Sequence, residues 1–282
     1  MGDGVLTGFD RDGLRFAVRD TGGGARGTVV CLHGFPQDGT AYDAVVPLLA
    51  AEGLRVLVPD QRGYSPGARP AGRRPYAVPE LVADVVALLD AAGVQRAHVV
   101  GHDWGGAVAW ALAGAAPQRV ASLTALSTPH PEAVRAALPR SSQVLRSWYM
   151  GFFQLPRVPE RLLLAGDGAR LRASLEGTGL AAERAAHYAR RMAEPGALTA
   201  ALGWYRALPV PHPAGGARGF TPVPVSYLWG RRDPFFAPAA VLGTGRHVTG
   251  PFTSRGLPVG HWVPEEAPAD VAAAVLAHAH RD

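Results

Sequence analysis

The sequence contains no lysine, no asparagine and no isoleucine among its 282 residues. These three residues have codons rich in A and T, so we infer a GC-rich bacterial genome, and the pI near 9.9 is a weak indicator of function. The formal net charge of +5 comes entirely from arginine. Because the arginines are scattered along the chain rather than gathered in a stripe, we expect no nucleic-acid partner.

Cysteine is almost absent as well. Cys31 stands alone in the apolar run Thr28–Leu32, so no disulfide can form within the chain and we expect this thiol to be buried in the core. No apolar stretch reaches about 18 residues, and the N-terminus has no basic segment followed by an apolar one. We therefore expect a cytoplasmic protein without a membrane partner, and the sequence leaves open whether it is a monomer or a homodimer.

Strand-like and helix-like segments alternate through the first 130 residues. Strands are expected as two short runs within 5–20 and at Thr28–Leu32, Leu54–Pro59, Ala97–Val100 and Val120–Ser127. Helices are expected at Ala41–Ala51, Val78–Ala92 and 105–116. This alternation is typical of an α/β protein with a mostly parallel central sheet covered by helices on both faces. In such a sheet we expect catalytic residues at the carboxyl ends of the strands.

The alternation stops after residue 130. Only helix-like segments follow, at 131–138, 141–154, 159–164, 181–193 and 197–208, before the Pro/Gly-rich linker Pro209–Gly219 and a new strand signal at Val223–Trp229. The simplest interpretation is a helical insertion after the sixth strand. We predict a lid domain at 131–216 on a core made of 1–130 and 217–282.

The segment Gly101–Gly105 holds the most informative side chain. It follows an apolar run, precedes a helix-like segment and reads G-x-S-x-G with Asp103 in the serine position. A carboxylate that attacked a carbonyl carbon would form a reactive mixed anhydride, whereas attack on saturated carbon gives an ordinary ester that water can hydrolyse. Asp103 is therefore predicted to attack an epoxide or an alkyl halide, and an esterase is disfavoured.

A nucleophile of this kind needs a base and a group that orients the base. The best base is His261, in a loop between the last strand-like run and the closing helix, about 266–279. The best orienting acid is Asp233, at the end of a buried strand before Pro234. The chain order of nucleophile, acid and base matches that of α/β-hydrolases.

Hydrolysis of an ester passes through an oxyanion that needs backbone donors. We predict that the N–H groups of Trp104 and Phe35 supply them, since Trp104 follows the nucleophile and Phe35 lies in the loop after the strand Thr28–Leu32. The Phe35–Pro36 bond is a candidate cis peptide. The ring of Phe35 is expected to line the substrate pocket.

Together these motifs resemble the epoxide hydrolase-like group of α/β-hydrolases. The segments that carry the resemblance occur in the order found in that group and span almost the whole chain: His33–Pro36, Asp60–Ser65, Gly101–Gly106, Trp229–Asp233 and Gly260–Trp262. The resemblance implies the α/β-hydrolase fold. It also implies that the Asp60–Ser65 loop is structural, with Arg62 held in hydrogen bonds.

The predicted lid offers the proton donor that an epoxide needs, because an epoxide oxygen leaves as a strongly basic alkoxide. Tyr149 and Tyr205 resemble the two lid tyrosines of the same group, whereas we interpret Tyr188 as a packing residue. Four side chains are predicted to bind an apolar substrate: Phe35, Trp104, Trp148 and Phe152.

We therefore predict an epoxide hydrolase that uses water to convert a small apolar epoxide into a vicinal diol, through an ester on Asp103 and without a metal or organic cofactor. The alternative is a haloalkane or haloacid dehalogenase with the same triad, in which Trp148 could donate to a halide. Many haloalkane dehalogenases have asparagine where this chain has Phe35, and haloacetate dehalogenases have arginine where it has Trp104. A catalytically idle ligand-binding protein is a third hypothesis.

Overall fold

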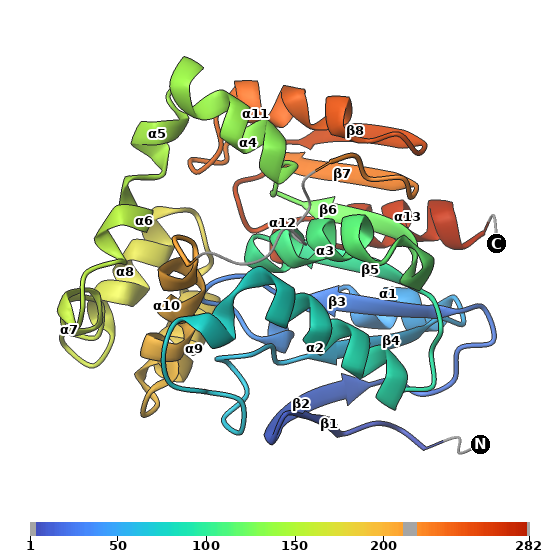
Figure 1. The fold of residues 1–282 in the computed structure, drawn as a ribbon, viewed down its shortest axis with the longest axis horizontal. Coiled ribbons are helices and arrows are strands. Elements are labelled where there is room, and N and C mark those ends of the chain that lie inside the picture. The colour runs from blue at the N-terminus through green and yellow to red at the C-terminus, as the bar shows by residue number, and fades with distance from the viewer. Residues whose placement is uncertain (1–3, 211–218, 281–282) are drawn as a thin grey trace.

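The computed structural model describes residues 4–210 and 219–280 and contains a sheet of eight strands (Figure 1). Their order across the sheet is β1-β2-β4-β3-β5-β6-β7-β8, with bounds β1 Gly8–Arg11, β2 Leu14–Asp20, β3 Thr28–Leu32, β4 Arg55–Pro59, β5 Ala97–His102, β6 Val120–Leu126, β7 Val225–Gly230 and β8 Phe252–Leu257. Strands β3 to β8 pair in parallel, whereas β1 pairs antiparallel with β2 and β2 pairs antiparallel with β4. The predicted mostly parallel sheet is thus confirmed.

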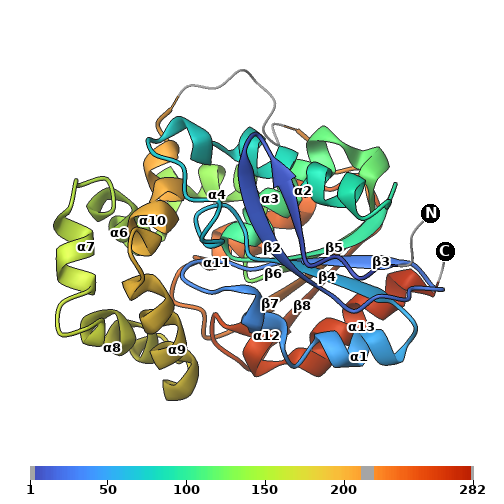
Figure 2. The ribbon, with the colours of Figure 1, turned by 90° about the horizontal axis from the view of Figure 1, so that it is seen from below.

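Helices cover both faces of the sheet, as the view in Figure 2 shows. One face carries α2 (Val78–Ala91) and α3 (Trp104–Ala115), and the other carries α1 (Val46–Ala51), α12 (Val263–Glu266) and α13 (Pro268–Ala279). Each face has its own cluster of buried apolar side chains, because strands covered on both sides bury every residue. Cys31 is fully buried in the second cluster, as expected.

Between β6 and β7 the described residues, up to 210 and from 219 on, form seven α-helices, which we call the helical insertion. Their bounds are α4 Pro131–Ala137, α5 Gln143–Arg146, α6 Trp148–Phe152, α7 Val158–Leu163, α8 Ala169–Gly177, α9 Ala182–Ala193 and α10 Ala197–Ala207. Helices α6 to α10 lie together at one end of the sheet, away from both termini (Figures 1 and 2). The linker Pro209–Gly219 and the proposed boundary at residue 216 fall largely outside the described residues.

The insertion differs from expectation in two places. The predicted helix over 141–154 is broken at Ser147, which ends α5 and begins α6. The break lets the buried Gln143 bond the loop after β7, where it donates to the carbonyl of Phe235 and accepts from the N–H of Ala237. Helix α8 was not predicted, since its sequence has few apolar residues.

Arg62 is held as the resemblance implied. Its guanidinium donates two hydrogen bonds to Asp84 of α2, at 2.7 and 2.6 Å, and both side chains are more than 90% buried. Arg11 donates to the same carboxylate at 2.7 Å. This buried ion pair joins the loop after β4 to a helix on the sheet face. No helix within residues 4–210 and 219–280 is long and apolar enough to cross a membrane.

The buried pair makes a testable difference to stability. We expect Asp84→Ala to lower the free energy of unfolding by about 3–5 kcal/mol, because Arg62 would stay buried without a counter-charge. Asp90→Ala is the matched control, since Asp90 is an exposed partner of Arg119 and should cost about 1 kcal/mol or less. Urea unfolding measures both, and equal losses would contradict the assignment.

Candidate active site

Asp103 lies on a sharp turn between β5 and α3, at the carboxyl edge of the sheet. Its backbone angles, φ 50° and ψ −120°, are ones that residues other than glycine rarely adopt. The turn leaves no space for neighbouring side chains. A Cβ at Gly105 would overlap the carbonyl of Leu32, and one at Gly34 would overlap the Asp103 side chain. The strand–turn–helix setting of a nucleophile elbow is therefore present.

The structure brings the three predicted triad residues together from three separate loops. His261 Nδ1 lies 2.7 Å from Asp233 Oδ2, and its Nε2 lies 3.7 Å from Asp103 Oδ2. The other oxygen of Asp233 accepts a hydrogen bond of 2.7 Å from the N–H of Phe235. The orienting acid is thus fixed by the backbone that follows it, and the imidazole stands between two carboxylates.

The charges in this triad are strongly coupled. Burial lowers the pKa of His261, but the two carboxylates outweigh it and raise that pKa to about 10. Burial would raise the pKa of Asp103, but hydrogen bonding and charge from His261 hold it below its usual range. Both shifts favour an ionised Asp103 beside a protonated His261.

The loop after β3 supplies one backbone donor to the nucleophile. The N–H of Phe35 donates to Asp103 Oδ1 at 2.8 Å, and the Phe35–Pro36 peptide is cis. The loop is fixed from behind, since the N–H of Gly34 donates to Gln37 Oε1 at 3.0 Å. Trp104 begins α3, so its N–H is one of the donors at the start of a helix that lack a partner within the helix.

Tyr149 of α6 and Tyr205 of α10 line the same cavity as Asp103. Their rings meet edge to face, with centroids 6.0 Å apart. Burial and the charge of Asp103 raise the pKa of both phenols above the ordinary value. Each phenol therefore keeps its proton at neutral pH and can donate it in a hydrogen bond.

The cavity above Asp103 has a volume of about 570 Å³. Its walls come from the core and from α5 to α8 and α10, and they are mostly aromatic and aliphatic: Phe35, Pro36, Leu145, Trp148, Tyr149, Phe153, Leu163, Leu171, Leu175, Tyr205, Pro234, Phe235 and Trp262. Trp148 is 69% exposed and lies at the solvent side, whereas Leu171 and Leu175 are buried. The cavity thus has an open apolar mouth and a closed apolar interior.

Two predicted substrate-binding residues do not line this cavity. Phe152, the last residue of α6, is absent from the cavity lining, and Phe153, the next residue, lines the cavity. The side chain of Trp104 packs edge to face on Trp204 and Tyr205, behind the cavity wall. Phe35 and Trp148 do line the cavity, as expected.

Sequence reasoning missed a polar group beside the triad. Gln37 donates to Glu265 at 2.8 Å, and Tyr188, predicted only as a packing residue, donates to the same oxygen at 2.9 Å. Both neighbours of the carboxyl come from distant parts of the chain, and no local motif marks them. The nearest signal is position: Gln37 follows the loop His33–Pro36, and Glu265 lies four residues after His261.

The fold and the site define a hydrolase of the nucleophile-elbow type. Residues 27–268 match the family described as alpha/beta hydrolase fold. Because this match spans most of the chain, the protein belongs to the alpha/beta hydrolase fold family.

Within that family the chain is similar to named relatives over nearly its full length. It is 34% identical to AB hydrolase superfamily protein YfhM of Bacillus subtilis over 97% of this chain and 98% of the relative. It is 30% identical to Epoxide hydrolase A of Mycobacterium tuberculosis, over 95% of this chain and 94% of the relative. The solved structure of Epoxide Hydrolase A from Mycobacterium thermoresistibile superposes with a TM-score of 0.80 at 26% identity, over 96% of each chain.

The coupling of charges predicts how His261 titrates. In the wild type its ring should stay protonated to about pH 10. In Asp103→Asn one of the two carboxylates that favour the cation is gone, so the ring should lose its proton at a lower pH. NMR titration of ¹⁵N-labelled histidine measures this. Asp10→Asn, an exposed carboxylate paired with Arg15, is the control and should leave the titration unchanged. An unchanged His261 in Asp103→Asn would refute the coupling.

Proposed function

We propose that this protein is an epoxide hydrolase that converts an apolar epoxide and water into a vicinal diol through an ester on Asp103. The observation that carries the proposal is the combination of a carboxylate on a nucleophile elbow with two buried phenols in one apolar cavity. The names of the relatives support it. We further propose that residues 131–216 act as a lid that covers the nucleophile.

In the first step an oxygen of Asp103 attacks a ring carbon and the epoxide C–O bond breaks. The departing oxygen needs a proton, and Tyr149 and Tyr205 are the acids that face the nucleophile across the cavity. Because both phenols keep their protons, they can bind the epoxide oxygen before reaction and one of them can protonate it. A halide would need no such proton, so this pair favours an epoxide over an alkyl halide.

Ester formation changes the charge of the site and thereby prepares the second step. Asp103 becomes neutral, so His261 retains only Asp233 as a counter-charge and its pKa falls. His261 then loses its proton, and this proton restores the phenol of the tyrosine that protonated the alkoxide. The neutral ring can now take a proton from water.

In the second step that water attacks the carbonyl carbon of the ester. The oxyanion is stabilised by the N–H groups of Phe35 and Trp104, and Asp233 stabilises the new imidazolium. The tetrahedral intermediate expels the product oxygen, which takes the proton back from His261 and leaves as the diol. The proton left on the Asp103 carboxyl then passes to the neutral ring of His261, which regenerates the carboxylate of Asp103 and the resting imidazolium. This sequence needs no metal or organic cofactor.

The cavity walls indicate the kind of substrate. Leucine and aromatic side chains dominate, so burial of an apolar substituent supplies the binding energy. Phe35 and Phe153 contact each other beside Tyr205 and are placed to pack on that substituent. Trp148 forms the mouth.

Trapping the intermediate tests the covalent route. In His261→Gln the ester should form but hydrolyse at least about 10³-fold more slowly, because its base is lost. Intact-protein mass spectrometry should then show an increase equal to the mass of the epoxide. Asp103→Asn is the matched control and should show no adduct and no diol. A His261→Gln protein that never accumulates adduct under turnover would contradict the route.

Replacing both phenols separates epoxide from halide chemistry. The double variant Tyr149→Phe/Tyr205→Phe should lose diol formation by at least about 10²-fold, since both candidate acids are removed. Product analysis should compare aryl and alkyl epoxides with bromoalkanes of the same carbon skeleton, whose leaving group needs no proton. Bromide release that survives the double change, without diol from any epoxide, would instead establish a dehalogenase.

A further inference from the structure

A buried carboxyl that the reaction above does not use lies close to the triad. Glu265 belongs to α12, which follows the base. Its Oε1 accepts hydrogen bonds from Gln37 and Tyr188, and its Oε2 is buried without a partner among the residues that the structure describes. Burial raises the pKa of Glu265 to about 7 in spite of these two donors. Burying a carboxyl costs desolvation free energy that an apolar residue at this position would not cost. This cost points to a role for Glu265 beyond packing.

The first donor, Gln37, connects this carboxyl to two catalytic groups. Its amide nitrogen donates to Glu265, and that bond fixes the direction in which the amide oxygen points. The oxygen accepts from the N–H of Gly34 and lies 2.7 Å from His102 Nδ1. Gly34 immediately precedes Phe35, whose N–H is the proposed oxyanion donor. Gln37 thus supports the oxyanion loop from behind.

The contact with His102 leads from Gln37 to the base. His102 Nε2 lies 2.8 Å from the main-chain carbonyl of His261, and Ser127 Oγ donates to the same carbonyl at 2.7 Å. Burial and the charge of His261 lower the pKa of His102 to about 3, and the buried ring, in contact with Gln37 on one side and the His261 carbonyl on the other, acts as a rigid spacer. If the Gln37 amide rotated, His102 Nδ1 would lose its contact with the amide oxygen, and the contact of His102 with the His261 carbonyl would be weakened.

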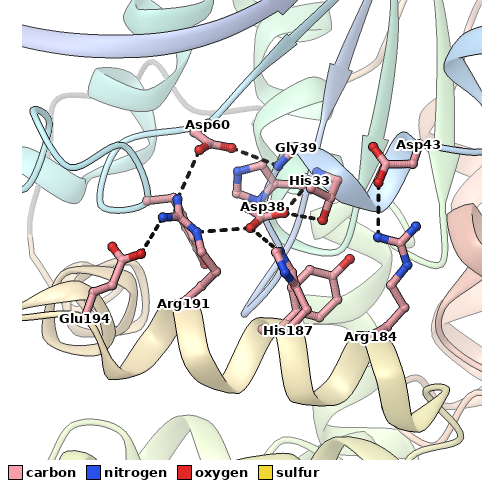
Figure 3. Close-up of polar contacts among 12 residues, drawn as sticks. His33, Asp38, Gly39, Asp43, Asp60, Arg184, His187, Arg191 and Glu194 are labelled. Atoms are coloured by element: carbon pink, nitrogen blue, oxygen red, sulfur yellow. Dashed lines mark hydrogen bonds and ion pairs between the residues drawn. The ribbon is translucent and has the colours of Figure 1, made fainter.

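The second donor ties the carboxyl to the helical insertion. Tyr188 lies on α9, which is held against the core by polar contacts on its other residues (Figure 3). These contacts are Arg184–Asp43 at 3.2 Å, His187–Asp38 at 2.8 Å, Arg191–Asp38 at 3.2 Å and Arg191–Asp60 at 3.2 Å. These contacts fix the position of α9, and the hydrogen bond from Tyr188 links that position to Glu265.

We propose that Glu265 is a positioning residue for hydrolysis of the ester, acting through Gln37 on the oxyanion loop and through Gln37 and His102 on the base. Its bond to Tyr188 makes this support depend on the seated position of α9. The inference rests on the proposed function, because it assigns Glu265 to the second step of that reaction.

The two-step reaction gives this role a distinctive kinetic signature. The constant kcat/KM reports events up to ester formation when that step is irreversible, whereas kcat also includes ester hydrolysis. A residue that positions only the hydrolytic groups should therefore change kcat and leave kcat/KM almost unaltered. A residue needed merely for folding would lower the amount of active enzyme and reduce both together.

The experiment compares Glu265→Leu with Glu265→Gln in the full-length protein. In Glu265→Leu we expect kcat to fall about tenfold, the order expected for losing one hydrogen-bonded support of a catalytic group, with kcat/KM within about twofold of wild type. The fraction of enzyme present as ester at steady state should rise in the intact mass spectrum. Glu265→Gln should recover most of kcat, because its amide oxygen can accept from both Gln37 and Tyr188.

Matched tyrosine variants probe the link to α9. Tyr188→Phe removes one donor to Glu265 and should lower kcat by about threefold without changing kcat/KM. Tyr227→Phe is the control, since the Tyr227 hydroxyl is equally buried but has no partner, and its kcat should not change. Equal falls in kcat and kcat/KM, or an unaltered kcat in folded Glu265→Leu, would overturn the proposal.

A spectroscopic readout keeps this inference separable from the proposed function. The proton on His261 Nδ1, in its 2.7 Å bond to Asp233, is expected to give a downfield NMR resonance. That resonance should shift in Glu265→Leu and return towards wild type in Glu265→Gln. If the wild type made no diol, the proposed function would fail, and the resonance would still decide: a shift supports the positioning role, and no shift refutes it.

Discussion

Two buried carboxylates share one imidazole, and the rest of the site is organised around that surplus of negative charge. Asp103 and Asp233 together hold His261 as a cation, which keeps the nucleophile ionised in a cavity that is otherwise apolar. Neutralising either carboxylate changes the state of the ring. In the proposed reaction the substrate itself does so when it esterifies Asp103. The order of the two chemical steps then follows from electrostatics, without any movement of the chain.

That arrangement depends on backbone geometry rather than on side-chain packing alone. The carboxylate of Asp103 reaches the cavity because the chain turns sharply between β5 and α3, and the turn is possible because Gly34 and Gly105 leave room for it. The same closeness lets the N–H of Phe35 reach Asp103. The proposed oxyanion donor and the proposed nucleophile are therefore brought together by one local constraint.

The sequence predicts the core and the meeting of Asp103, Asp233 and His261, and it predicts the cavity walls only in part, for a physical reason. Asp103, Asp233 and His261 lie at ends of strands, and a parallel sheet brings such ends to one edge. Tyr149 and Tyr205 also line the cavity, as the resemblance implied. Which of Phe152 and Phe153 lines the cavity depends instead on how the short helix α6 is placed in the tertiary structure, and no local motif sets that placement. The contact of Gln37 with Glu265 joins residues 228 apart, so only tertiary structure reveals it.

The helices of the insertion are not all attached to the core in the same way. Helix α9 meets the core through several charged side chains, whereas α7 and α8, in the described part of the chain, make no ion pair with it. Yet Leu163, Leu171 and Leu175 of α7 and α8 line the cavity. Mutations there can reshape the cavity while the catalytic groups stay in place. Natural or directed evolution can therefore change the substrate preference through substitutions in α7 and α8 while the residues of the proposed triad keep their positions.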